Sequence, residues 1–79
     1  MITAYLLIII KPGNTKNVIK EMRKIENIEK ISVVAGEYDV VVRVNVKSLE
    51  KLLKITDKIQ MIDGVKKTTT HVIEKEIAL

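Results

Sequence analysis

The chain has no cysteine, tryptophan or phenylalanine, and only one histidine, one proline and two tyrosines. Without cysteine it can form no disulfide, thiolate nucleophile, zinc finger or iron–sulfur site. Its longest apolar run, Ala4 to Ile10, has seven residues, whereas about 20 are needed to span a bilayer. The N-terminus shows no basic segment followed by an apolar stretch and a small-residue cleavage site, so nothing in it indicates secretion. These absences predict a soluble, cytoplasmic protein with no membrane partner.

The 79 residues are 47% hydrophobic and 30% charged, with a net charge of +4. This length predicts one domain over residues 1–79, and the hydrophobic content is too high for a disordered chain. The 13 isoleucines and 10 valines supply more apolar surface than one small core can bury. We therefore predict a homo-oligomer. A composition rich in Lys, Glu and Ile is also typical of thermophile proteins.

Stretches of β-branched residues alternate with stretches of helical periodicity, and they predict six elements in the order β-α-β-β-α-β. The first helix is expected to begin at Asn14 or Thr15 and to carry Val18, Ile19, Met22 and Ile25, and the second to begin at Ser48. The strands are expected over residues 3–11, 29–35, 38–46 and 65–76.

An internal repeat supports this order. Asn14 and Ser48 lie 34 residues apart, and the same offset relates Val18 to Leu52. A helical solenoid with this period needs at least three copies, whereas two βαβ copies describe an α+β, ferredoxin-like βαββαβ fold. Right-handed crossovers would place both helices on one face of a four-stranded antiparallel sheet.

The first strand is apolar on both of its faces, unlike a strand that has one face in water. Two helices can cover only one face of a sheet, so the other face would expose aliphatic side chains. The simplest cover is the same sheet of a second copy, stacked face to face. The alternative is a hydrophobic strand that is mostly buried within the monomer. The two sets are Tyr5, Leu7 and Ile9 on one side, and Ala4, Leu6, Ile8 and Ile10 on the other.

A short turn, Gly36-Glu37-Tyr38-Asp39, lies between two apolar strands. Glycine permits unusual backbone angles, and glutamate is an ordinary solvated turn residue. Asp39 is unusual because it precedes a run of valines, where aspartate is disfavoured. It is either a local cap that accepts nearby backbone N–H groups or an anchor for a cationic ligand group. The residues alone do not decide between these two roles.

The last strand carries Thr68, Thr69 and Thr70, of which the first and third share a face. They are either plain strand formers or a pair of presented hydroxyls. His71 has no cysteine or second histidine near it, so it makes a poor metal ligand. The sequence contains no phosphate-binding or nucleophile-elbow motif. We predict no catalytic residue, no metal site and no cofactor.

The positive net charge makes nucleic acid a partner to consider. The helix lysines are interleaved with glutamates, which is typical of a solvated helix face. RNA-binding domains of this fold stack bases on aromatic residues, but the corresponding strands here carry Ile, Leu and Val. We therefore predict no direct nucleic-acid binding. The lysines concerned are Lys16, Lys20, Lys24, Lys51, Lys54 and Lys58.

Three stretches together resemble the effector-binding (RAM) domain of the Lrp/AsnC transcriptional regulators, over about Thr3 to Ile73. They are A-Y-L-L-I-I-I-K-P-G, E-K-I-S-V-V-A-G-E-Y-D-V-V-V-R-V and I-x-x-I-D-G-V-K-K-T-T-T-H-V-I. The resemblance implies dimers that pack sheet to sheet and assemble into octamers or decamers, with amino-acid effectors between dimers. The family's ligand contacts match Gly36, Tyr38 and Asp39, and Thr68 and Thr70.

This assignment suits the chemistry of an amino acid. Its ammonium group favours a carboxylate such as Asp39, and its carboxylate favours the backbone N–H groups of a glycine turn. The regulators also carry a helix-turn-helix domain, which the 79 residues lack, so the sequence resembles a stand-alone, ACT-like effector domain without a DNA-reading element.

The main hypothesis is a non-enzymatic module that senses amino acids, oligomerises and modulates the transcriptional regulation of amino-acid metabolism. One alternative is a ligand-free assembly partner of full-length Lrp/AsnC regulators. Another is a small dimeric enzyme with an active site between helices and sheet, for which His71 and Arg43 are the only acid–base candidates.

Overall fold

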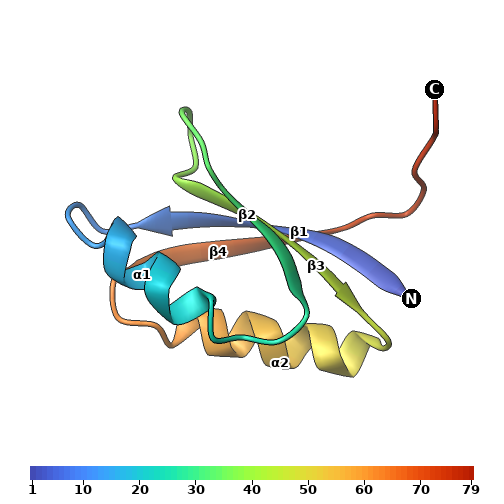
Figure 1. The fold of residues 1–79 in the computed structure, drawn as a ribbon, viewed down its shortest axis with the longest axis horizontal. Coiled ribbons are helices and arrows are strands. Elements are labelled where there is room, and N and C mark those ends of the chain that lie inside the picture. Colours follow the sequence, from blue (N-terminus) through green and yellow to red (C-terminus); the bar gives the residue numbers. More distant parts are fainter.

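A computed structural model describes all 79 residues and contains six elements in the predicted order (Figure 1). The strands form one antiparallel sheet in the order β2-β3-β1-β4. Both helices lie on the same side of this sheet (Figure 1). The predicted ferredoxin-like α+β fold is confirmed. The elements are β1 (Ile2–Ile10), α1 (Thr15–Met22), β2 (Ile28–Val33), β3 (Val40–Val46), α2 (Leu49–Gln60) and β4 (Val65–Val72).

The core lies between the sheet and the helices, and the two central strands build most of it. Alternate side chains of β1 and β3 point toward the helices and are at most 6% exposed. Burying each such side chain contributes about 1.5–3 kcal/mol. No polar or charged residue belongs to this core. The core residues are Ala4, Leu6, Ile8, Ile10, Val18, Met22, Val40, Val42, Val44, Val46, Leu52, Ile55 and Ile59.

The side of the sheet away from the helices, here called the open face, is partly apolar. Leu7 and Ile9 of β1 and Val41 of β3 lie on it and are half-buried, and Tyr5 is 37% exposed. The prediction that β1 is apolar on both faces is therefore confirmed. No element of the chain packs along this face as the helices do on the other (Figure 1).

The two helices start at the predicted positions but differ in how they are capped. The Ser48 hydroxyl accepts the Lys51 N–H at 3.2 Å, which satisfies one of the free N–H groups at the start of α2. Asn14 occupies the same position before α1 without making a side-chain cap. Its amide instead donates to the carbonyl of Pro12 at 3.1 Å.

Several predicted boundaries were wrong. Helix α1 ends at Met22, so Ile25 lies beyond it, in a turn that contains Asn27 at a φ of 72°. Asparagine tolerates this left-handed conformation better than most residues. Strand β3 begins at Val40, not at residue 38, and β4 ends at Val72, not at residue 76. The pairing of β4 with β1 stops there: Ile73 N–H donates to the Thr3 carbonyl at 2.9 Å, and no backbone hydrogen bond follows.

Gly64 holds the turn before β4 against the start of α1. Its φ is +104°, and a Cβ added there would lie 2.7 Å from the Asn14 Cβ. Its carbonyl also accepts the Lys11 N–H at 2.8 Å. The Gly in the D-G-V motif is therefore required by both backbone angle and close approach.

We predict that Gly64→Ala lowers the free energy of unfolding by about 2 kcal/mol, through backbone strain and the clash with Asn14. Gly13 is the matched control, because its φ is +83° and an added Cβ would meet nothing within 4 Å. Gly13→Ala is expected to cost about 1 kcal/mol, from backbone strain alone. Urea unfolding followed by circular dichroism measures both. Equal losses would show that the close approach does not matter.

Candidate functional site

The predicted loop residues Gly36, Tyr38 and Asp39 lie together between β2 and β3. This loop rises from the sheet on the side of the open face (Figure 1). Gly36 has a φ of +146°, a conformation that side chains disfavour. Tyr38 is half-buried. The structure thus places three of the five predicted residues on one short segment.

Asp39 acts as a cap for the end of β1. Its Oδ2 atom accepts the Ile10 N–H at 2.7 Å. Its own N–H donates to the Ile8 carbonyl at 3.0 Å, and its carbonyl accepts the Val34 N–H at 3.1 Å. The side chain therefore takes the place of a further residue in the β1–β3 ladder, and β3 starts at Val40, two residues later than predicted. The second carboxylate oxygen, Oδ1, has no hydrogen bond within the chain and remains available to a donor.

The other two predicted residues, Thr68 and Thr70, lie on β4 and share a face, as predicted. They pair with Ile8 and Leu6 of β1, so they point toward the helix side of the sheet. Thr70 is exposed, and Thr68 is half-buried. The Thr68 hydroxyl oxygen is buried and has no hydrogen-bond partner.

The two groups of predicted residues do not meet in a single chain. β1 lies between them, since Ile8 pairs with Val40 on one side and with Thr68 on the other. Two strand spacings correspond to roughly 10 Å. None of the surface hollows of the single chain is lined by the loop residues 36–39. A shared site formed with another subunit stays a prediction.

The unpartnered hydroxyl of Thr68 leads to a measurable expectation. We predict that Thr68→Val raises the free energy of unfolding by about 1 kcal/mol, because a buried hydroxyl without a partner is costly and valine has the same shape. Thr70→Val, at an exposed position, should change it by less than about 0.5 kcal/mol. Urea unfolding measures both variants. A loss of stability in Thr68→Val would show that the hydroxyl has a partner, supplied by an assembly or a ligand.

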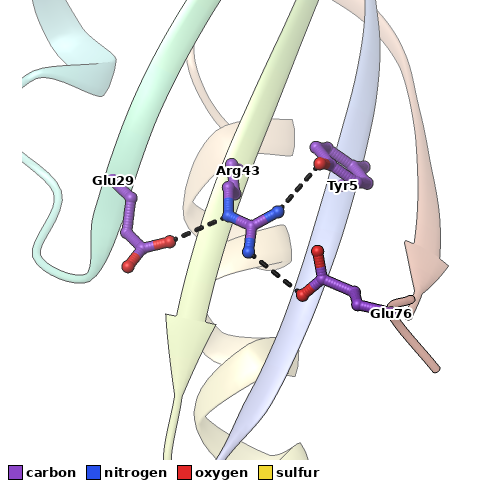
Figure 2. Close-up of polar contacts among 4 residues, drawn as sticks. All are labelled: Tyr5, Glu29, Arg43 and Glu76. Carbon is purple, nitrogen blue, oxygen red and sulfur yellow. Dashed lines mark hydrogen bonds and ion pairs between the residues drawn. The ribbon is translucent and has the colours of Figure 1, made fainter. Parts of the chain in front are cut away.

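The open face carries a polar cluster around Arg43 (Figure 2). The Arg43 Nη1 atom donates to the Tyr5 hydroxyl at 2.8 Å. Its Nε and Nη2 atoms contact the carboxylates of Glu29 at 3.1 Å and Glu76 at 3.2 Å. The guanidinium carbon also lies 5.5 Å from the centre of the Tyr5 ring, within the range of a cation–π interaction.

The contacts with Glu76 and then Tyr5 raise the pKa of Arg43 above its ordinary value. The side chain therefore stays positively charged at any physiological pH and cannot act as a base. His71 pairs with Tyr5 across the β1–β4 ladder, so it also lies on the open face. Neither residue lies between the helices and the sheet, where the enzyme alternative placed its acid–base group.

The sequence interpretation missed this cluster, although one signal was present. The valines that alternate with Arg43 are buried, so Arg43 must point to the open face, as Tyr5 does. The partnership with Glu29 depends on an irregularity between Ile28 and Lys30, which alternation does not predict. Glu76 lies beyond the last strand, and its position depends on how the chain turns after β4.

Charged groups elsewhere form exposed pairs. Lys24 contacts Glu21 at 2.9 Å, and Lys54 lies 4.0 Å from Glu50. The hydrogen bond from Lys24 lowers the pKa of Glu21. Exposed pairs of this kind contribute little to stability. No group of three or more potential metal-ligating side chains is present, and neither helix has the length and hydropathy needed to cross a membrane.

A family model decides the identity. The model of the Lrp/AsnC ligand binding domain matches residues 3–78 of the sequence. The chain belongs to the Lrp/AsnC family. The resemblance inferred from the sequence motifs is therefore confirmed, and the fold just described is that of the ligand-binding domain of transcriptional regulators.

Individual relatives agree with this assignment. The HTH-type transcriptional regulator FL11 of Pyrococcus abyssi is 35% identical over 72 residues, which cover 91% of this chain and 48% of that regulator. This Lrp/AsnC domain thus spans about half the length of the curated regulators it matches. The crystal structure of TTHA0845 from Thermus thermophilus superimposes with a TM-score of 0.92 at 26% identity and covers 100% of both chains.

Two other matches are a regulator solved with a bound amino acid and an enzyme. The feast or famine regulatory protein Rv3291c of M. tuberculosis, complexed with L-methionine, has a TM-score of 0.85 at 24% identity, covering 100% of this chain and 54% of that one. At this identity the likeness shows the fold alone. Homocitrate synthase of Sulfolobus acidocaldarius is 32% identical over 63 residues, which cover 80% of this chain but only 14% of that enzyme.

Proposed function

We propose that this Lrp/AsnC domain binds an amino acid between the subunits of an oligomer and thereby modulates transcriptional regulators of amino-acid metabolism. The carboxylate of Asp39 carries the proposal. One of its oxygens is fixed by the Ile10 N–H at 2.7 Å, and the other is left without a partner, so the group is both positioned and available. A positioned carboxylate suits the ammonium group of an amino acid.

The rest of the proposed site comes from the same loop and from β4. Backbone N–H groups around Gly36 would receive the ligand carboxylate, and Tyr38 would line the site. Thr68 and Thr70 would belong to another subunit, because β1 separates them from Asp39 in one chain. The L-methionine complex of the M. tuberculosis protein supports the idea that this fold can hold an amino acid.

The proposed oligomer starts from the open face. Leu7, Ile9 and Val41 form a partly exposed apolar surface there, and a second sheet is the simplest cover for it. We propose that such dimers assemble further into octamers or decamers, with the effector sites between dimers. Mixed assemblies with full-length Lrp/AsnC regulators would give this domain access to DNA that it does not itself contact.

The proposed role is not enzymatic. The curated relatives of which about half matches most of this chain are HTH-type transcriptional regulators. The matching part of homocitrate synthase is a small fraction of that enzyme, so the match carries no enzymatic activity to this chain.

Isothermal titration calorimetry with each of the twenty amino acids at millimolar concentration tests the proposal. We expect saturable heat with at least one of them. The matched control is the 2-oxo acid with the same side chain, which lacks the ammonium group and should give none. Absence of heat with all twenty amino acids would overturn the proposed sensing role.

One observation favours a second candidate function. Asp39 already serves as a cap, so it has a structural reason to be present without any ligand. The domain would then be a ligand-free assembly partner of full-length regulators. In that case a regulator co-purifies with the chain, and added amino acids change neither the yield nor the size of the complex.

A further inference from the structure

The chain after β4 turns across the open face and then leaves the body of the molecule. We call residues 74–79 the arm. The last backbone hydrogen bond before it joins Ile73 N–H to the Thr3 carbonyl. Within the arm, the 3.2 Å contact between Glu76 and Arg43 is the one polar contact with the rest of the chain. Ile77 is 74% exposed, and Leu79 is fully exposed.

The direction of the arm is informative. It rises from the sheet on the side away from the helices, at the opposite end from the loop between β2 and β3 (Figure 1). Figure 2 shows Glu76 reaching Arg43 from this side, over β1. The arm therefore points into the space that a second sheet would occupy.

Residues 76–79 have the reach to cross that space. Stacked sheets lie about 10 Å apart, and the three steps from Glu76 to Leu79 span roughly 10 Å when extended. Ile77 and Leu79 would thus reach the second sheet, because Glu76 is held on the first sheet by Arg43. In a single chain these two side chains stay mostly exposed, so little burial compensates for ordering the arm, and one exposed ion pair contributes little.

We propose that the arm is an intersubunit element. The Arg43–Glu76 pair fixes the position of Glu76 on the open face, and Ile77 and Leu79 pack against a second copy of this chain. The inference rests on the sheet-to-sheet dimer of the proposed function. A second copy is the occupant because Glu76 is bound to the open face itself, which is the face that the second sheet covers in the proposed dimer. Each copy would give one arm and receive one.

Sedimentation velocity on the wild type and four variants tests the proposal. We expect a chain ending at Ile73 and the Ile77→Ser variant to dimerise at least tenfold more weakly, because an apolar contact is lost in each of two arms. Arg43→Gln should also weaken the dimer, because the ion pair that holds Glu76 on the open face is lost. Lys75→Ser is the matched control on the same arm, and it should leave the dimer dissociation constant unchanged.

Isotope-filtered NMR on a mixture of labelled and unlabelled chains gives a second readout. Contacts between the Ile77 methyl groups and the other copy are expected. A stable dimer with an unchanged dissociation constant in Ile77→Ser, and with no such contacts, would overturn the arm alone and leave the sheet dimer standing. A wild-type chain that stays monomeric at millimolar concentration would overturn both.

Discussion

Leu7→Asp is expected to convert the oligomer into a folded monomer. Leu7 lies on the open face and is half-buried by its own chain, so a second sheet would complete its burial. In a two-fold symmetric dimer the substitution places two unpaired carboxylates in the interface. Each costs about 2–3 kcal/mol or more, so the dimer dissociation constant should rise at least about a thousandfold. Size-exclusion chromatography with light scattering measures the change in mass.

The adjacent residue provides the control. Leu6 points to the opposite side of the same strand and is 0% exposed. Leu6→Ala should lower the free energy of unfolding by about 2–5 kcal/mol through a core cavity, whereas Leu7→Asp should leave the circular dichroism spectrum of the folded chain intact. An unchanged oligomeric mass in Leu7→Asp would show that the open face is not the interface.

Asp39→Ala is expected to abolish amino-acid binding. Removing one partner of a desolvated charge pair costs about 2–5 kcal/mol, which is a loss of affinity of roughly 30-fold to several thousandfold. The same substitution also leaves the Ile10 N–H without its acceptor, so it should reduce the stability of the fold by about 1–3 kcal/mol. Calorimetric titration measures the first effect and urea unfolding the second.

Asp39→Asn separates the two roles. The amide oxygen can still accept the Ile10 N–H, so stability should be nearly unchanged, while the charge that attracts an ammonium group is gone. Asp63→Asn, at an exposed turn position, is the matched loss of a carboxylate elsewhere and should bind as the wild type does. Wild-type affinity in Asp39→Asn would disprove the ligand role and leave Asp39 as a cap only.

The sequence predicted what depends on local periodicity. Alternation in β1 correctly gave the two sets of side chains on opposite faces and the apolar open face, because side chains of a strand must alternate between faces. The 34-residue repeat correctly placed Asn14 and Ser48 before the two helices. It did not predict that α1 is shorter than α2, because Ile25 keeps the apolar spacing after the helix has ended.

The predictions that failed or were missed depend on contacts between distant residues. The start of β3 depends on Asp39 reaching Ile10, 29 residues away in sequence. The Arg43 cluster joins residues 38 and 33 positions apart, and no motif encodes this. The separation of the loop residues from Thr68 is different, because it follows from the strand order of the predicted fold, which places β1 between them.

Asp39 links two strands through hydrogen bonds. Its side chain accepts from the Ile10 N–H of β1, and its carbonyl accepts from the Val34 N–H after β2. β1 also carries Leu7, which lies on the open face. A ligand that binds the Asp39 carboxylate therefore binds a group that already holds the end of the strand that would form the dimer. Thermodynamic reciprocity then requires that any effect of the ligand on subunit association be matched by an equal effect of association on ligand affinity. Dilution alone would change the sensitivity of such a sensor.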